Sequence, residues 1–213
     1  MSVQPLRRIG VLVSGRGTNL QSILDAVAAG SLDGTVEVVL SNRREAPGLV
    51  RAREAGVDAS YLDPRRSTSR DAYDRAIADE LKARAVDLVC LAGYMRLIGP
   101  PLLDAFPLRI LNIHPSLLPS FPGLEAQRQA IDHGVKVSGA TVHLVTAELD
   151  GGPIVLQGSV PVLSGDTVES LSARILVEEH RLYPQAIRIM LAGSWRIEGR
   201  CFVHPVRSGD PSR

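Results

Sequence analysis

The alternation of short apolar segments with longer segments of helical periodicity constrains the fold of this chain more than any other feature. Apolar or β-branched segments predict five strands, at 8–14, 35–42, 58–63, 87–93 and 109–115. Helical patterns separate the first four of them, at 18–30, 46–56 and 69–85. The fourth and fifth strands are continuously apolar, which is typical of a sheet covered on both faces. We therefore predict an α/β fold with a doubly wound, mostly parallel sheet flanked by helices.

The pattern changes from about residue 136 onward. Two strand-like segments surround the sequence LDGGP, which predicts an antiparallel hairpin, and a long helical pattern follows at 167–193. The length of 213 residues fits a single domain. We expect this domain to cover 1–195. We expect a C-terminal tail at 196–213, which is rich in Gly, Pro and Ser near its end and should fray.

Composition argues against several functional classes. A net charge of +1 and an aromatic content of 4% do not favour a nucleic-acid partner. The two cysteines, Cys90 and Cys201, belong to no CxxC pair, so no zinc site is expected. The N-terminal apolar segment is too short for a signal peptide, and no 18-residue apolar stretch predicts a membrane helix. We expect a soluble cytoplasmic protein without a membrane partner.

The sequence VSGRGTNLQ leads from the first predicted strand into a helix. Gly15 and Gly17 let the backbone approach a ligand, and the N–H groups at the start of the helix suit an anion. Thr18 or Asn19 can add a side-chain hydrogen bond. Leu20 replaces the third glycine of the dinucleotide fingerprint, so a single phosphate fits better than NAD. An ordinary capped turn between strand and helix explains the same residues.

The sequence LRILNIHPSLLPSFPG ends a predicted strand with Asn112 and His114 and continues into a loop with three prolines. Ligands of such folds bind at the carboxyl ends of parallel strands. The two side chains share strand parity and therefore point to the same face. An amide and an imidazolium can both donate to a developing oxyanion, and the imidazolium can also donate a proton. Alternatively, Asn112 caps a turn and His114 is a half-buried structural histidine, which this stretch alone favours slightly.

Two further segments allow both a structural and a functional interpretation. Asp150 lies in LDGGP and fits a hairpin turn, but near His114 its carboxylate would favour the charged imidazole. The segment LAGYMRLIGPPLL follows the fourth strand and predicts either a solvated connection or a slot for a flat, partly apolar ligand.

The remaining histidines give weaker signals. His143 alternates within the predicted hairpin and can face either side of the sheet. We expect His133 and His180 on the surface, and we expect no role for His204 in the tail.

Taken in order, six segments resemble the phosphoribosylglycinamide formyltransferases, a family of folate-dependent enzymes of purine biosynthesis. The resemblance extends from about Arg8 to Arg196 and rests on SGRGTNLQSILDA, SNRREAPGLVRAREAGV, SRDAYDRAI, LAGYMRLI, NIHPSLLPSFPG and HLVTAELDGGPIVLQGSVPV. It implies transfer of a formyl group from 10-formyltetrahydrofolate, as co-substrate, to the amine of glycinamide ribonucleotide. It implies no metal and no partner beyond these small molecules. The protein would be a monomer or homodimer.

The resemblance also assigns residues. Its catalytic residues correspond to Asn112, His114 and Asp150. The residues that bind the ribonucleotide correspond to Gly17, Thr18, Asn19 and Glu179. Those that bind the folate correspond to Arg70, Met95, Arg96, Leu97, Ile98, Asn112 and the loop from Thr146 to Asp150. Accordingly, we expect a phosphate-binding half at about 1–100 and a folate-binding, catalytic half at about 101–195.

The chemistry that the resemblance implies needs no Ser or Cys nucleophile, because the substrate amine attacks the formyl carbon directly. Asn112 and protonated His114 would stabilise the tetrahedral oxyanion, and Asp150 would hold His114 charged. Alignment of two bound substrates would supply much of the rate.

The chain departs from the family pattern near the proline-rich loop. Glu125 and Gln127 stand where the family often has histidines, and Ser120 stands where it often has lysine. The order and pH response of the 116–135 loop are therefore open.

Several other functions compete with this one. Methionyl-tRNA formyltransferase and formyltetrahydrofolate deformylase share the same fold, but each usually carries an extra domain for which we expect no room here. A non-catalytic phosphate-binding module is the alternative from another class. A dinucleotide-dependent oxidoreductase is disfavoured by the missing third glycine.

Overall fold

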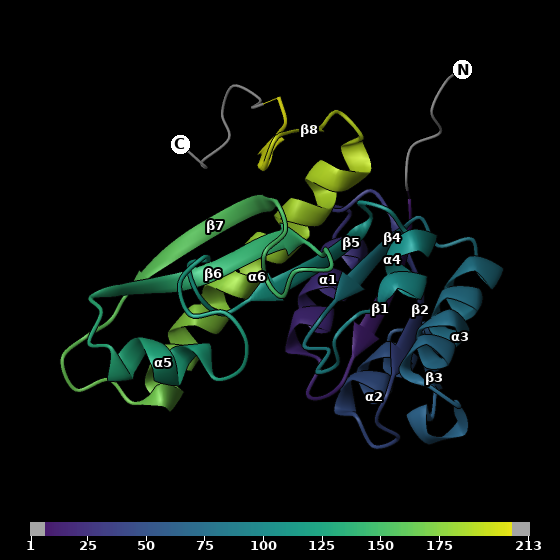
Figure 1. Cartoon of the computed structure of the whole chain (residues 1–213), viewed down its shortest axis with the longest axis horizontal. Coiled ribbons are helices and arrows are strands. Elements are labelled where there is room, and N and C mark those ends of the chain that lie inside the picture. The colour runs from purple at the N-terminus through teal and green to yellow at the C-terminus, as the bar shows by residue number, and fades with distance from the viewer. Residues whose placement is uncertain (1–6, 206–213) are drawn as a thin grey trace.

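The computed structural model of this chain describes residues 7–205, and its centre is a seven-stranded sheet in the order β3-β2-β1-β4-β5-β6-β7 (Figure 1). Parallel pairing joins the first five strands of the chain: β1 (Arg8–Val13), β2 (Thr35–Ser41), β3 (Asp58–Tyr61), β4 (Leu88–Leu91) and β5 (Ile110–His114). The remaining two strands pair antiparallel and form a hairpin: β6 (Val137–Leu144) and β7 (Ile154–Pro161). The predicted α/β fold and its hairpin are confirmed.

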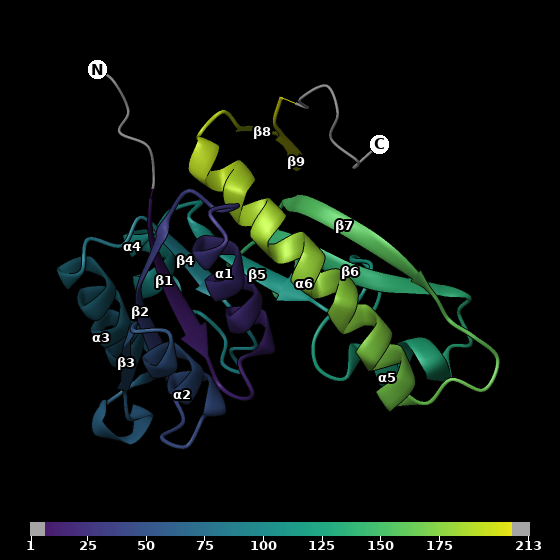
Figure 2. The same cartoon turned by 180° about the vertical axis from the view of Figure 1, so that it is seen from behind.

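Helices cover both faces of the sheet. The helices are α1 (Thr18–Ala28), α2 (Pro47–Glu54), α3 (Arg70–Ala83), α4 (Pro100–Ala105), α5 (Ala126–Asp132) and α6 (Val168–Ala192), with a 3-10 turn η1 (Pro64–Arg66). Side chains alternate along β1, so Val11 packs with α1, α2 and α6, whereas Leu12 packs with α3 and α4. Figure 2 shows α1 and α6 side by side on the first of these faces.

The long helix α6 contacts both the parallel strands and the antiparallel hairpin of the sheet. Thr167 caps its N-terminus by accepting from the Ser170 N–H at 3.2 Å, and Gly193 ends it in the left-handed conformation. At its centre, the fully buried Tyr183 donates from its hydroxyl to the carbonyl oxygens of Leu91 and Leu111, at 2.9 and 3.2 Å. These carbonyls belong to β4 and β5, so the tyrosine fixes α6 against two neighbouring strands.

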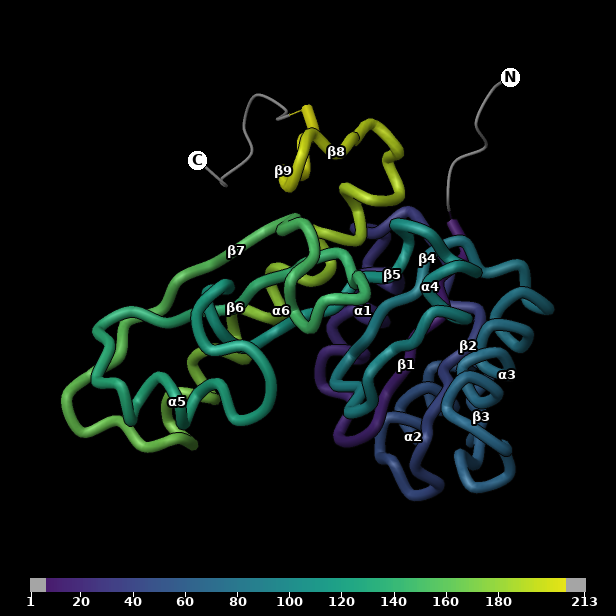
Figure 3. The backbone as a smooth tube through the Cα atoms, viewed as in Figure 1, coloured from purple at the N-terminus to yellow at the C-terminus, as the bar shows by residue number. Residues whose placement is uncertain are grey.

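The expectation that the tail frays from residue 196 was wrong over its first part. Residues Arg196–Glu198 (β8) and Cys201–Val203 (β9) form an antiparallel hairpin, which Figure 3 traces beside β7. Strands of three residues are too short to show an alternating pattern in a sequence. The short helix α4 was also not predicted as an element; it begins at Pro100, where proline's fixed φ suits a first helical turn. The end of the predicted tail, 206–213, lies outside the described residues.

We expect Tyr183→Phe to lower the free energy of unfolding by about 1 to 2 kcal/mol, because it removes a buried donor and leaves two carbonyl groups with fewer partners. Urea unfolding followed by circular dichroism measures this change. A free energy of unfolding equal to that of the wild type would show that the hydroxyl does not stabilise the contact between α6 and the sheet.

Candidate active site

The carboxyl end of β5 presents the two polar residues that the sequence analysis singled out. Asn112 is half-buried and His114 is 4% exposed. The neighbouring strand is β6, which pairs antiparallel with Asn112 opposite His143 and His114 opposite Thr141. Directly opposed residues of antiparallel strands lie close enough for their side chains to interact. The change from parallel to antiparallel pairing at β5 therefore concentrates polar groups at this edge of the sheet.

His114 contacts an acceptor through each of its ring nitrogens. Nε2 lies 2.8 Å from the carbonyl oxygen of Phe121, and Nδ1 lies 3.5 Å from Oδ2 of Asp150. A carbonyl oxygen only accepts, so Nε2 carries the proton in that contact. Each ring nitrogen of His114 therefore faces an oxygen that can only accept a hydrogen bond or carry negative charge.

Asp150 lies close to His114, as the functional interpretation of the sequence required. It belongs to the loop 145–153 between β6 and β7 and has a φ of +50°. Its side chain is 9% exposed. Oδ2 accepts from the Gly123 N–H at 2.8 Å, and Oδ1 lies 3.6 Å from Nε2 of His143. The carboxylate thus joins this loop to the proline-rich loop and to His114.

His143 belongs to this cluster, although the sequence analysis left its side open. Its Nδ1–H donates to the Leu144 carbonyl at 3.0 Å, and burial lowers the pKa of His143, so the neutral ring is favoured. Nε2 is then an acceptor, and it receives a hydrogen bond from Nδ2 of Asn112 at 3.1 Å. This contact orients the Asn112 amide and leaves its second N–H available. The strand register of the hairpin was the signal that could have found His143.

Thr141 fixes the proline-rich loop next to the cluster. Its buried hydroxyl donates to the Ser116 carbonyl at 2.7 Å and accepts from the Leu118 N–H at 3.0 Å. Gln157 from β7 donates to the same hydroxyl oxygen and to the Leu118 carbonyl, both at 2.9 Å. Side chains from two strands therefore hold the loop that supplies the Phe121 carbonyl to His114.

A second polar region lies at the end of β1. Gly17 precedes α1 with a φ of +71°, and a Cβ there would come within 2.6 Å of the Gly48 Cα. No side chain caps α1, so its first N–H groups remain available to an anion. A cavity of about 420 Å³ opens beside this loop and includes Arg16, Arg43 and Arg44 in its lining. The geometry and the charge both suit a phosphate group.

Glu179 reaches this region from α6. It is 7% exposed, and its Oε2 accepts from Nδ2 of Asn19 at 2.8 Å. Burial raises the pKa of Glu179 to about 7, while the hydrogen bond from Asn19 acts in the opposite direction. Oδ1 of Asn19 is buried and has no hydrogen-bond partner among residues 7–205. The structure thus brings together the predicted residues Gly17, Thr18, Asn19 and Glu179.

The sequence model of the formyl transferase family matches residues 7–187. This chain belongs to the formyl transferase family. Phosphoribosylglycinamide formyltransferase of Escherichia coli (strain K12) is 46% identical to it over 196 residues, which cover 92% of this chain and 90% of that protein. The crystal structure of glycinamide ribonucleotide transformylase 1 from Symbiobacterium toebii is 64% identical, with a TM-score of 0.92 over 92% of this chain and 93% of that chain. The trifunctional purine biosynthetic protein adenosine-3 of Bos taurus is 42% identical, and the match covers 20% of its length.

In this formyl transferase, the segment predicted to bind folate follows β4. The Met95 N–H donates to the Ser14 hydroxyl at 2.8 Å, and that hydroxyl donates to Oδ1 of Asn42 at 2.6 Å. Met95 and Leu97 are 59% and 54% exposed, whereas Arg96 lies over the Tyr73 ring at 5.0 Å. Arg96 is therefore partly shielded from water by the Tyr73 ring, unlike the solvated connection that the sequence also allowed.

The other predicted folate residues lie on α3, at the end of this segment and in the loop 145–153. Arg70 begins α3 and is exposed, and the buried Asp74 of that helix accepts from the Gly99 N–H at 2.7 Å, which ties α3 to the end of the segment. Ile98 is half-buried and packs against the core beneath α3 and α4. Thr146 lies in the loop that also carries Asp150, and its hydroxyl lies 3.4 Å from the Glu148 carbonyl.

The expectation for one of the remaining histidines was wrong. His180 is half-buried in α6 because α1 packs against this helix, and none of the described residues hydrogen-bonds to its buried Nε2. His133 is exposed as expected and packs on the Phe121 ring at 5.2 Å. Within residues 7–205, no group of three or more His, Cys, Asp or Glu side chains is arranged to hold a metal ion. None of the helices described here is long and apolar enough to cross a membrane.

The buried Glu179 predicts a pH-dependent stability. Its pKa is raised from 4.5 to about 7 in the folded chain, so the folded state binds the proton more tightly than the unfolded state. The stabilisation that protonated Glu179 gives the folded state is present in full below about pH 4.5 and is lost as pH rises through about 7. Glu179→Gln cannot lose this proton. From pH 4.5 to pH 7, we therefore expect the free energy of unfolding of the wild type to fall by about 2 to 3 kcal/mol relative to that of the variant. Urea unfolding of both proteins at several pH values measures the difference, and parallel curves would contradict it.

Proposed function

We propose that this chain transfers the formyl group of 10-formyltetrahydrofolate to the amine of 5′-phosphoribosylglycinamide, a step of de novo purine (IMP) biosynthesis. The observation that carries the proposal is the cluster of Asn112, His114 and Asp150 at the carboxyl end of β5, in a chain that is 46% identical to a phosphoribosylglycinamide formyltransferase over most of its length. A reaction of this kind needs groups that stabilise negative charge on an acyl oxygen and that supply a proton.

The ribonucleotide would bind between β1 and α6. Backbone N–H groups at Gly17, Thr18 and Asn19 would hold its phosphate, since the first turn of α1 offers them without a competing cap. Glu179 would contact the ribose hydroxyls, because its carboxyl group lies beside Asn19, its one side-chain hydrogen-bond partner within the described part of the chain. The Asn19 Oδ1, to which no residue of the described range 7–205 donates, would accept a hydrogen bond from the same ligand.

The formyl folate would bind between Met95–Ile98 and the loop 145–153. Met95, Leu97 and Leu149 are all more than half exposed and offer apolar surface to a flat aromatic ring. Arg70 would face the acidic end of the molecule from the start of α3. These residues fit a partly apolar, anionic ligand, and the co-substrate supplies an activated formyl group.

The chemistry would then use the polar cluster at β5. Asn112 has one N–H directed to His143 and a second available to the oxygen on which charge develops. As the bond between the formyl carbon and the folate nitrogen breaks, His114 would donate to that nitrogen its Nε2 proton, which contacts the Phe121 carbonyl in this structure. Asp150, beside Nδ1 of His114, would help to remove the proton that the attacking amine loses. Alignment by two rigidly held loops supplies the proximity that direct attack by an amine requires.

We also propose that residues 1–195 act as a single domain with a phosphate-binding half at about 1–100 and a folate-binding, catalytic half at about 101–195. The hydrogen bond between Asn19 and Glu179 joins the two halves, and one sheet continues through both. Whether the enzyme is a monomer or a homodimer stays a prediction of the sequence analysis.

A spectrophotometric assay of 10-formyl folate consumption, with and without glycinamide ribonucleotide, tests the function. We expect turnover that depends on the ribonucleotide and that falls by about 10²- to 10⁴-fold in His114→Ala, which removes a proton donor from the cluster. His204→Ala serves as the matched control, because this histidine lies in the tail outside the cluster.

Other outcomes of this assay would contradict the proposal in different ways. Turnover without the ribonucleotide would indicate a deformylase, which transfers the formyl group to water. No turnover by the folded wild type would favour a binding module.

His143→Ala should lower kcat by about 10-fold or more while KM for either substrate changes little. The substitution removes the acceptor that orients the Asn112 amide. It therefore weakens the stabilisation of charge on the reacting oxygen and leaves the surfaces that bind the substrates unchanged. Steady-state kinetics with each substrate varied in turn measures this. A rise in KM with unchanged kcat would place His143 in substrate binding instead.

A further inference from the structure

The C-terminal hairpin β8–β9 is firmly attached to the body of the protein. The Trp195 ring stacks on Phe202 with centroids 5.3 Å apart, and its Nε1–H donates to the Met190 carbonyl at the end of α6. Trp195, Ile197 and Phe202 all pack against the large core cluster beneath α6. An aromatic pair with a buried edge stabilises such a short hairpin more than its few backbone hydrogen bonds can. The hairpin is therefore a platform with a defined position.

The turn of this hairpin reaches the loop that carries Asp150. Gly199 adopts a φ of +62° in the turn, and the next residue is Arg200. Nη2 of Arg200 donates to the Gly151 carbonyl at 2.8 Å, and Nη1 lies 3.6 Å from Oε2 of Glu148. Gly151 follows Asp150 directly, so the arginine holds the peptide group next to the proposed catalytic carboxylate.

The loop 145–153 needs such support. Asp150 has a φ of +50°, a conformation that costs free energy for a residue other than glycine and persists only where neighbouring contacts hold it. Glu148 and Leu149 are exposed, so burial contributes little on this side of the loop. Among the described residues, the tip at 146–151 is hydrogen-bonded to the rest of the chain through the Asp150 carboxylate and through Arg200.

We propose that Arg200 is a positioning residue for the formyl-transfer reaction: by binding the Gly151 carbonyl, the C-terminal hairpin holds the loop 145–153 in the conformation that directs Asp150 toward His114 and shapes one side of the formyl folate site. The kinetic part of this inference rests on the proposed function. The proposal depends on the hydrogen bond between Arg200 and the Gly151 carbonyl, because the exposed ion pair with Glu148 contributes little by itself in water.

Loss of the Arg200 contact should affect the use of the formyl folate and not the binding of the ribonucleotide. The loop 145–153 lies on the proposed folate side, whereas the phosphate loop at Gly17 is formed by β1 and α1. Because the Arg200 side chain is 78% exposed, water weakens its hydrogen bond, and loss of that bond corresponds to about a threefold to tenfold change in an equilibrium. Arg200→Ala should therefore lower kcat/KM for the formyl folate by about threefold to tenfold, while KM for the ribonucleotide and the unfolding temperature stay unchanged. Arg200→Lys should restore part of the loss, because an ammonium group can also donate to the carbonyl.

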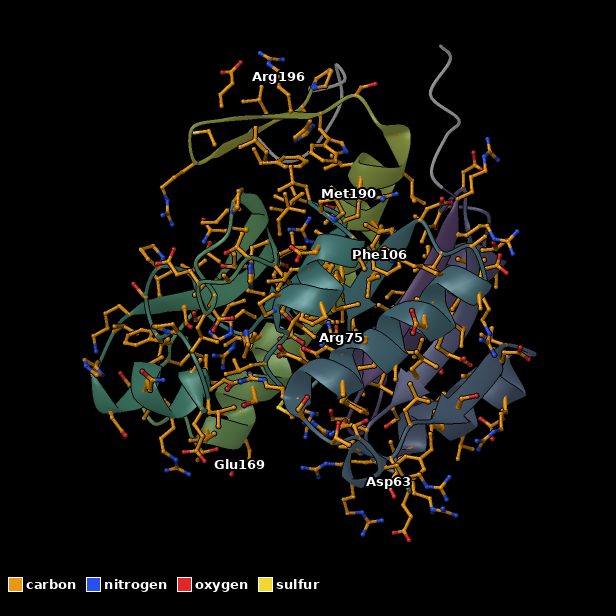
Figure 4. All side chains as sticks on the ribbon, turned by 45° about the vertical axis from the view of Figure 1, so that its right-hand side comes forward. Asp63, Arg75, Phe106, Glu169, Met190 and Arg196 are labelled. Carbon is orange, nitrogen blue, oxygen red and sulfur yellow. The ribbon has the colours of Figure 1, made fainter. Side chains whose placement is uncertain are left out.

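The matched control is Arg196→Ala. Arg196 lies on the same hairpin, is exposed and pairs with Glu198 within β8, without a contact to the loop. Figure 4 labels it at the top of the view, beyond Met190 at the end of α6. Both variants remove one arginine from the same hairpin, so a difference between them reports on the contact with Gly151.

Kinetics and amide hydrogen exchange of the full-length protein together test the proposal. We expect Arg200→Ala, and not Arg196→Ala, to show faster exchange over residues 145–153 together with the selective loss in kcat/KM. Equal exchange and kinetics in Arg200→Ala and the wild type would overturn it. A lowered unfolding temperature with weaker binding of both substrates would also overturn it, because that pattern indicates a general loss of stability. If the wild type shows no formyl transfer, the proposed function fails, and the exchange measurement still decides whether Arg200 holds the loop.

Discussion

The carboxylate of Asp150 is the interaction on which the arrangement of the candidate site depends. It is almost fully buried, and such a group is stable only when its oxygens have hydrogen-bonding or charged partners. Those partners come from separate parts of the chain: the Gly123 N–H from the proline-rich loop and His114 from β5. Because one carboxylate contacts both, neither the proline-rich loop nor the loop 145–153 can move independently without leaving buried polar groups unpaired.

The antiparallel pairing of β6 with β5 gives this carboxylate its surroundings. The antiparallel register places His143 directly opposite Asn112, and it also sets Thr141 opposite His114, where the threonine hydroxyl holds the proline-rich loop. One hairpin thus supplies an orienting histidine, a loop anchor and the loop that carries Asp150. The polar edge follows from sheet topology before any ligand is considered.

The sequence predicted the parts of this structure that have a periodic signal. Continuous apolar strands separated by helical patterns predicted the sheet, and strand parity predicted that Asn112 and His114 share a face. The approach of Asp150 to His114 could not be derived from spacing, because a loop between two strands can project in several directions. The side of the sheet that His143 faces was left open for a related reason. Alternation along a strand groups residues by face, but only the register with the neighbouring strand shows which face lies toward the site. The hairpin β8–β9 was missed because three-residue strands have no period to detect.

The departures of this chain from the family pattern near the proline-rich loop become easier to understand in the structure. Glu125 adopts a φ of +55° before α5, is exposed and pairs with Arg128 at 3.3 Å, so it lies outside the cluster of buried polar groups. The nearby Gln129 donates from Nε2 to the carbonyls of Pro122 and Leu124, at 3.1 and 3.0 Å. The Gln129 amide thus holds these two carbonyls without a histidine side chain. The order of this loop in the described structure therefore comes from Gln129 on one side and from Thr141 and Asp150 on the other, and none of these three side chains occupies a position where the family often has histidine.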